Sequence, residues 1–176
     1  MNPDLVEGLH YSIMFYGGRL LSHLTANDPE VDEFISLRRL NRNIVIIMDS
    51  DRAKKGSRIN NTKQRIKKEF DQGPGFAWVT QGREIENYID PILLERAVKE
   101  VHPSAVKLIR CDQYSNCLYY RTADRKKVQA DKVKVARKVA ESPANLDVLN
   151  LKTQIRRLCR FILESNQRDY YDTSCS

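Results

Sequence analysis

The sequence predicts an α/β fold, with a mainly parallel sheet flanked by helices and a basic helical carboxyl-terminal part. The first observation is an unbroken apolar run, Ile44 to Met48, typical of a strand buried on both faces. The second is a helical pattern that opens at Asp28-Pro29 and joins this strand to an aromatic alternating segment, His10 to Tyr16. Strand, helix and strand in succession form the unit that builds parallel sheets.

Composition limits the classes of function. The chain has 176 residues and a net charge of +7, which favours polyanionic partners such as nucleic acid. No apolar run approaches membrane-spanning length and the first residues lack a signal-peptide pattern, so we expect a soluble cytoplasmic protein without a membrane partner. The four cysteines match no zinc-binding spacing, and we expect reduced thiols. The sequence leaves open whether the chain forms a homo-oligomer.

Further elements follow the first two strands. A helix is expected from Asn61 to Phe70, with Ile66 and Phe70 inward and four cations largely outward: Lys63, Arg65, Lys67 and Lys68. We predict a strand over residues 76–80, a helix that opens at Asp90-Pro91 and ends near His102-Pro103, and helices over residues 124–140 and 151–162. We assign no element to residues 104–123. Residues 1–100 are expected to form the α/β core, and residues 101–176 a mostly helical, basic part.

Two carboxylates follow the apolar strand directly. Functional groups in parallel sheets gather beyond the carboxyl ends of the strands, where Asp49 and Asp51 lie. If the chain stays extended there, its period of two places both carboxylates on one side and Ser50 on the other. Such hard oxygen ligands suit Mg²⁺ or Mn²⁺. The alternative is a cap at the start of a helix, because Asp and Ser favour such turns.

A second carboxylate pair, Glu84 and Glu86, follows the strand predicted over residues 76–80. Acidic residues also favour the first turn of a helix, and that interpretation remains open. Two pairs, each after a strand, nevertheless match the carboxylate-rich sites of two-metal phosphoryl chemistry. The loop after Asp51 is basic and would suit a phosphodiester backbone, although it could equally be a solvated surface; its cations are Arg52, Lys54, Lys55 and Arg58.

Four segments together resemble the Toprim domain (the topoisomerase-primase fold) of the OLD (overcoming lysogenization defect) family of ATP-dependent nucleases. They are His10 to Leu24, Ile47-Met48-Asp49-Ser50-Asp51-Arg52, Gly82-Arg83-Glu84-Ile85-Glu86-Asn87-Tyr88-Ile89, and Asp131 to Arg137. The resemblance covers most of the chain. It implies a Toprim-like core and a metal-dependent DNA endonuclease, with a role in phage defence or DNA processing.

The resemblance also implies roles for single residues. Asp49 and Asp51 match the metal-binding pair, and Glu86, with Glu84, matches the acid that helps to hold a second ion. Lys132, with Lys134 as the second choice, matches the late lysine that stabilises charge on the scissile phosphate. A lysine suits this role because it presents a compact positive charge. We therefore expect Asp49, Glu86 and Lys132 to be catalytic, and Lys134 and Arg137 to contact DNA.

The chain also departs from the family pattern. Val6-Glu7-Gly8 has the form of the family's first catalytic motif, but the next predicted strand begins almost at once, so we interpret Glu7 as lying outside the site. On this interpretation the first Toprim strand is missing. No phosphate-binding Gly-x-x-x-x-Gly-Lys-Ser/Thr motif occurs. We therefore expect an ATPase domain on a longer chain or on a separate partner.

Two rival hypotheses remain. The chain could be a catalytically incomplete Toprim module that binds DNA or a partner ATPase. It could also be a phosphatase-like hydrolase with Asp49 as nucleophile and Asp51 as acid, although the residues after Asp51 do not continue that pattern.

Overall fold

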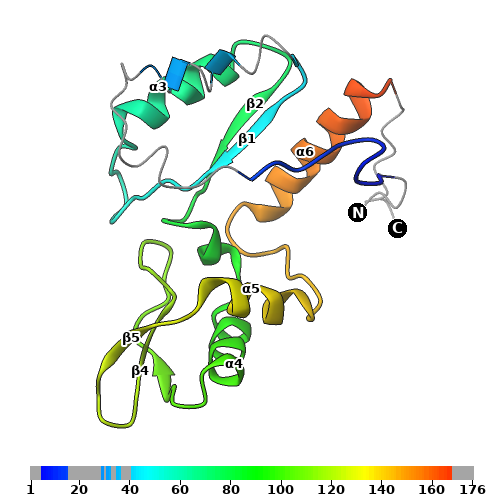
Figure 1. The fold of residues 1–176 in the computed structure, drawn as a ribbon. Helices are drawn as coiled ribbons and strands as arrows, with labels where there is room; N and C mark the ends of the chain where they lie inside the picture. The colour runs from blue at the N-terminus through cyan, green and yellow to red at the C-terminus, as the bar shows by residue number, and fades with distance from the viewer. Residues whose placement is uncertain (1–4, 16–28, 30, 33–34, 37–40, 168–176) are drawn as a thin grey trace. The chain divides into compact units, whose positions relative to one another are not determined.

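The structure is a computed structural model that describes residues 5–15, 29, 31–32, 35–36 and 41–167. These residues form a mixed α/β protein with small parallel and antiparallel sheets (Figure 1). Contacts divide the chain into two compact units. Unit 1 comprises residues 1–47, 60–78 and 152–176, and unit 2 comprises residues 48–59 and 79–151. The predicted boundary near residue 100 stays a prediction.

Unit 1 contains most of a strand pair, helix α3 (Asn61–Phe70) and nearly all of helix α6 (Leu151–Ser165). Strand β1 (Val45–Met48) pairs with β2 (Phe76–Val79), and both strands enter unit 2 at their last residue. In Figure 1, α3 and α6 lie on either side of this pair. Phe76 packs edge-on against Phe161 of α6 and lies under the guanidinium of Arg157. These contacts give the apolar face of α6 its partner.

Helix α3 has the predicted bounds. The side chain of Asn60 caps it by accepting a hydrogen bond from the N–H of Lys63 (2.8 Å). Ile66 and Phe70 are fully buried, as predicted. The prediction that Lys63 points outward is wrong, because its exposed fraction is only 4%. Lys63, Ile66 and Phe70 are spaced three and four residues apart and therefore share one helical face.

Two strand predictions need correction. Ile47 is 44% exposed whereas Ile46 and Met48 are buried, so β1 is not covered on both faces. Residues 12–15 have no regular structure, and Tyr11 makes only an isolated bridge with Glu7. Among the described residues, no neighbouring strand forms a β-ladder with this alternating aromatic segment. Residues 16–28, including the predicted helix start at Asp28, lie outside the described part of the chain.

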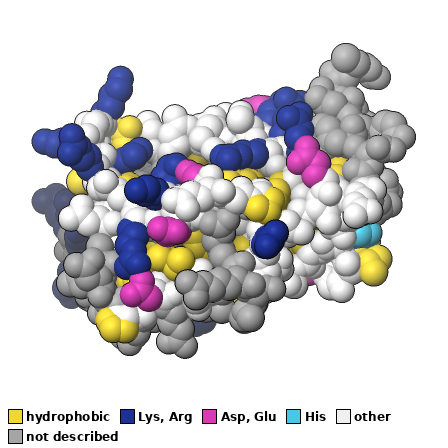
Figure 2. All heavy atoms as spheres, turned by 90° about the horizontal axis from the view of Figure 1, so that it is seen from above, with side chains coloured by type: hydrophobic (Ala, Val, Ile, Leu, Met, Phe, Trp, Pro, Cys, Tyr) yellow, Lys and Arg dark blue, Asp and Glu magenta, His cyan; other side chains and the backbone are white. Residues whose placement is uncertain are grey.

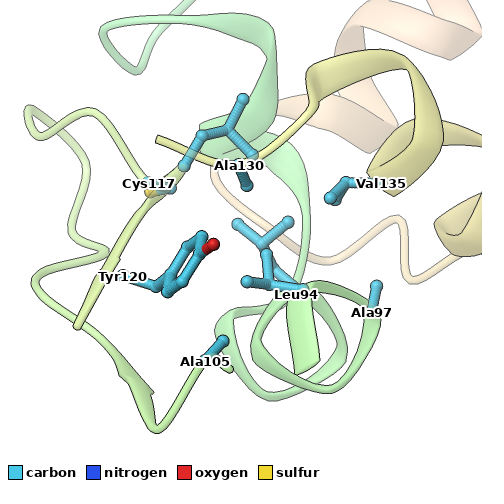
Figure 3. Packing of buried hydrophobic residues seen from close by; sticks show 9 residues of the cluster. Leu94, Ala97, Ala105, Cys117, Tyr120, Ala130 and Val135 are labelled. Atoms are coloured by element: carbon cyan, nitrogen blue, oxygen red, sulfur yellow. The ribbon is translucent and has the colours of Figure 1, made fainter. Parts of the chain in front are cut away.

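Unit 2 combines helices with a three-stranded antiparallel sheet. Helix α4 (Pro91–Val101) begins at the Asp90 cap, as predicted, and α5 spans Lys132–Ala140. The sheet has the order β3-β4-β5, with β3 at Lys107–Leu108, β4 at Tyr119–Arg121 and β5 at Lys127–Gln129. Leu94 and Val98 of α4 pack with Tyr120 of β4 and Val135 of α5 in one buried cluster (Figure 3). Through Val135, this core fixes α5 against α4 and β4.

The helix predicted over residues 124–140 begins too early. Residues 127–129 form β5, which pairs with β4, and the helix begins only at Lys132 after the Asp131 cap. Residues 124–130 are charged and have only weak helical periodicity. In this segment, pairing with β4 provides the backbone hydrogen bonds that a helix would otherwise provide. Among the described residues no helix is both long enough and apolar enough to cross a membrane.

The prediction of reduced thiols is wrong for one cysteine pair. Cys111 and Cys117 form a disulfide that closes a short loop in unit 2. The turn between them brings their Cα atoms to 4.4 Å, a proximity that their spacing in the sequence did not show. Cys159 is a half-buried free thiol, and Cys175 lies outside the described residues.

Candidate metal centre

The loops after β1 and β2 are joined by hydrogen bonds through Ser50. The N–H of Ser50 donates to the Thr80 hydroxyl (2.9 Å), and the Ser50 hydroxyl donates to the carbonyl oxygen of Gly82 (2.6 Å). Two backbone bonds continue the pairing: Thr80 N–H to Met48 O (3.0 Å) and Asp51 N–H to Arg83 O (2.9 Å). Ser50 is almost fully buried. The segment that carries Asp49 is therefore held against the segment that carries Glu84 and Glu86.

Asp49 is a half-buried carboxylate aimed at the second segment. Its Oδ1 accepts a hydrogen bond from the N–H of Ile85 (2.8 Å), the first residue of a short 3-10 helix, η1 (Ile85–Tyr88). Burial raises the pKa of Asp49, and the negative charges of Glu86 and Asp51 act in the same direction. The positive charge of Lys132 and the Ile85 hydrogen bond oppose this rise without cancelling it. A cation beside Asp49 would relieve this electrostatic cost.

Glu86 and Lys132 form an ion pair in which Lys132 Nζ lies 2.5 Å from Glu86 Oε1. The Glu86 side chain is 7% exposed, whereas that of Lys132 is 57% exposed. Glu86 Oε2 is buried and has no hydrogen-bond partner among the described residues. An orphaned carboxylate oxygen is costly, and in functional sites it marks the place of an absent partner. Here that partner would be positively charged or a hydrogen-bond donor.

Lys132 is placed by the start of α5. Asp131 caps this helix by accepting from the N–H of Lys134 (3.0 Å), and its own N–H donates to His102 Nε2 (2.9 Å). Burial by itself would lower the pKa of Lys132. The hydrogen bond and charge of Glu86, together with the charges of Asp49 and Glu84, outweigh burial and raise that pKa. Lys132 is therefore charged at neutral pH.

Glu84 lies at the entrance to η1 and is half-buried. Burial raises its pKa, and the charges of Glu86 and Asp49 raise it further. Its carboxylate contacts Arg83 Nε at 3.4 Å and Asn116 Nδ2 at 3.4 Å, and it forms a capping box with Asn87 at the start of η1. Glu84 therefore belongs to the same electrostatic cluster as Asp49 and Glu86.

Asp51 differs from the extended arrangement that the sequence predicts. Its φ is +54°, in the left-handed region, so the chain turns at Asp51 instead of continuing as a strand. Asp51 is exposed, whereas Asp49 is half-buried. The argument from a period of two therefore fails at Asp51. The two carboxylates are still close enough for the charge of Asp51 to affect the pKa of Asp49.

The predicted DNA-binding cations lie in unit 2, on the loop after β1 and on α5. Most are exposed: Lys54, Lys55, Arg58, Lys134 and Arg137. Arg52 is half-buried, and its Nε has no hydrogen-bond partner among the described residues. Figure 2 shows that lysines and arginines are interspersed with carboxylates on the face in view. These predicted DNA-binding residues therefore occupy two separate segments, a loop and a helix.

Several supporting residues were not identified from the sequence. Ser50, Thr80, Gly82 and Asn87 are buried and connect the two carboxylate segments. Their residue types are common in turns, so the sequence at a single position does not indicate a supporting role in a site. The Asp-Ser-Asp spacing was a usable clue, since a small hydroxyl between two acids suits a buried hydrogen bond.

A divalent cation fits the chemistry of this cluster in part. The donors are carboxylate oxygens, which Mg²⁺ and Mn²⁺ prefer, and Glu86 Oε2 is buried with no hydrogen-bond partner in the described part of the chain. In the described part of the chain, no three His, Cys, Asp or Glu side chains already form a metal-binding group. Mg²⁺ is often held by one or two carboxylates with several waters, so a preformed group of three is not required. Asp49 and Glu86 would be the primary ligands, with Glu84 and Asp51 next.

Comparisons of the chain with protein-family models, with curated proteins and with solved structures found no match.

Proposed function

We propose that this chain is the Toprim-like part of an OLD-family ATP-dependent nuclease and hydrolyses DNA phosphodiester bonds with Mg²⁺ or Mn²⁺. One observation carries the proposal. Asp49, Glu86 and Lys132 come from three distant segments, and the ion pair between Lys132 and Glu86 lies in the electrostatic field of Asp49. Acids that bind cations, beside a lysine that can face a phosphate, are the components of a phosphodiesterase site.

Each residue has a distinct role in this proposal. Asp49 and Glu86 bind the ions, and Glu84 and Asp51 complete the negative field that attracts them. When bound, the ions polarise the phosphate and lower the pKa of attacking water. Lys132, which is charged and more than half exposed, places a positive charge on the phosphate as negative charge develops there.

The substrate class follows from charge. The basic loop over residues 52–58 and the cations of α5 flank the carboxylates in the sequence of unit 2 and would neutralise the DNA backbone. Backbone contacts of this kind position a nucleic acid without reading its sequence. The proposed ATPase partner, the cytoplasmic location and the role in phage defence rest on family analogy alone.

The first experiment is a nicking assay on supercoiled plasmid with Mn²⁺, Mg²⁺ or EDTA. The wild type is compared with Asp49→Asn, which keeps an acceptor for the Ile85 N–H but removes the charge. Asp124→Asn, an exposed acid in the β4–β5 turn, is the matched control. Metal-dependent nicking that Asp49→Asn lowers by about 100-fold or more, and Asp124→Asn leaves intact, supports the proposal. Nicking that persists in EDTA or in Asp49→Asn contradicts it.

A second candidate is a catalytically incomplete module that binds DNA or a partner ATPase. It is favoured by two observations: Lys132 already neutralises Glu86, and the described acids form no ready metal-binding group. This candidate predicts salt-sensitive DNA binding without nicking under any metal condition. The same assay, run beside a binding measurement, separates the two functions.

A further inference from the structure

Asn87 is a buried amide that is bonded in two directions. Its Oδ1 accepts a hydrogen bond from the N–H of Glu84 (2.7 Å). Its Nδ2 donates to the carbonyl oxygens of Asp112 (2.7 Å) and Ser115 (3.0 Å), and contacts Cys117 Sγ at 3.3 Å. The residue is only 7% exposed. Both ends of the amide are thus satisfied, which fixes its orientation.

The packing around Asn87 extends to Asp49. A Cβ atom added to Gly82 would lie 2.5 Å from Asn87 Cβ, so only glycine allows this approach. The carbonyl oxygen of Gly82 in turn accepts hydrogen bonds from the hydroxyls of Ser50 (2.6 Å) and Thr80 (2.9 Å). Ser50 directly follows Asp49. A continuous set of contacts therefore joins the two carboxylate segments through Gly82 and Asn87.

The loop that receives the Asn87 amide is covalently closed. Asp112 and Ser115, whose carbonyls accept from Asn87, lie between the two cysteines of the Cys111–Cys117 disulfide. A short disulfide-closed loop has few accessible conformations, so its carbonyl groups form a stable base for the amide. Glu84 is the N-cap residue of the 3-10 turn that Asn87 stabilises, and Glu86 lies within that turn.

We propose that Asn87 is a positioning residue for the metal centre: it fixes the turn carrying Glu84 and Glu86 against the disulfide-closed loop. This inference rests on the proposed function, because it assumes that these acids bind a divalent ion. Residues that orient metal ligands change metal affinity by about 10- to 100-fold when they are replaced. Asn87 itself does not contact the ion or the substrate in this role.

The test measures Mn²⁺ binding by electron paramagnetic resonance for the wild type, Asn87→Ala and Asn87→Asp. Both variants are expected to bind Mn²⁺ about 10- to 100-fold more weakly with an unchanged number of sites. The aspartate variant is informative because it keeps the acceptor for Glu84 and adds a negative charge. The added charge alone would strengthen cation binding, so weaker binding isolates the lost bonds to the loop.

Val98→Ala controls for a general loss of stability. Val98 is buried in the core of unit 2 and contributes no side chain to the carboxylate segments. Partial unfolding would reduce the number of Mn²⁺ sites per chain, whereas loss of positioning would reduce the affinity. Val98→Ala is therefore expected to keep the wild-type affinity at a temperature where circular dichroism shows all variants folded.

A second measurement tests the role of the loop closed by the Cys111–Cys117 disulfide. Dithiothreitol reduces the Cys111–Cys117 bond by thiol–disulfide exchange, giving two thiols and the oxidised reagent. Reduction is expected to weaken Mn²⁺ binding several-fold in the wild type and to have no further effect in Asn87→Ala, because the loop acts through the missing amide. An equal effect in both proteins would overturn this part of the inference.

The outcomes separate the two proposals. If the wild type binds Mn²⁺ and Asn87→Ala and Asn87→Asp bind it equally well, the inference about Asn87 is wrong and the proposed metal centre stands. If the wild type binds no Mn²⁺ while Asp49 and Glu86 are intact, the proposed function and the inference both fail.

Discussion

Asp49 accepts a hydrogen bond from the backbone N–H of Ile85 at 2.8 Å, across 36 positions of sequence. Ile85 is the residue between Glu84 and Glu86. One carboxylate of the first acidic pair is thus bonded directly to the backbone of the second pair.

Replacing Lys132 by methionine is expected to strengthen Mn²⁺ binding and to abolish cleavage. The ammonium of Lys132 contacts Glu86 at 2.5 Å and competes with any cation for that carboxylate. Removing one positive charge near a partly exposed site should raise affinity by about fivefold or more. Cleavage should fall because no lysine then faces the phosphate. Mn²⁺ titration and plasmid nicking measure the two effects.

Lys134→Met is the matched control for this prediction. Lys134 lies two residues further along α5, is exposed, and interacts with Asp131 at 3.7 Å. It should change Mn²⁺ affinity much less than Lys132→Met does. Equal changes in the two variants would mean that the general field of the helix, rather than contact with Glu86, controls the site.

The raised pKa values of Asp49 and Glu84 predict how the metal-free protein responds to pH. A carboxyl group whose folded-state pKa is raised holds its proton more tightly in the folded state than in the unfolded state. Its contribution to stability is therefore largest at acid pH and is lost as pH rises through the folded-state pKa. Lys132 stays charged over this range, since its pKa is also raised.

Chemical denaturation at a series of acid pH values measures this effect as the difference between the wild type and Asp49→Asn. The wild type should lose stability relative to the variant as pH rises. Saturating Mg²⁺ should reverse the trend, because the ion stabilises the ionised carboxylate. A pH-independent difference would show that Asp49 titrates alike in the folded and unfolded states.

The basic loop predicts a change in the salt dependence of DNA binding. Replacing Lys54 and Lys55 by alanine should reduce the slope of log K against log salt by about 2, if each lysine contacts one phosphate. The control removes the same charge elsewhere in unit 2, through Lys107→Ala with Lys126→Ala. Fluorescence anisotropy over a range of salt gives both slopes. Identical slopes for the two double variants would exclude a specific role for the loop.

Gly82→Ala is expected to destabilise the protein by roughly 1–3 kcal/mol, the usual cost of overpacking. The added methyl would lie 2.5 Å from Asn87 Cβ and 3.2 Å from the carbonyl oxygen of Gln113. Urea denaturation measures the loss. Gly56→Ala is a useful comparison, because its added Cβ meets no atom within 4 Å and its cost comes only from a φ of +82°. A fully tolerated Gly82→Ala would contradict the close packing of Asn87.

Local patterns predicted much of the secondary structure. The Asp90-Pro91 pair marked the start of α4, the pattern of apolar and charged residues from Asn61 to Phe70 indicated α3, and the apolar run marked β1. These features depend on neighbouring residues, so the sequence contains the information directly. The antiparallel sheet was not predicted, because its strands are only two or three residues long and depend on distant partners.

The acidic residues of the candidate site were likewise chosen from the sequence, by their spacing after two strands and by a family resemblance. Their arrangement was not predictable. The tertiary structure decided that Asp51 turns into the left-handed region, that Lys132 pairs with Glu86, and that Asn87 joins Glu84 to the loop of Cys111 and Cys117. Residue type and spacing determine which chemistry is available. Which groups meet is decided by packing and hydrogen bonds between segments far apart in the chain, and these have no local signature in the sequence.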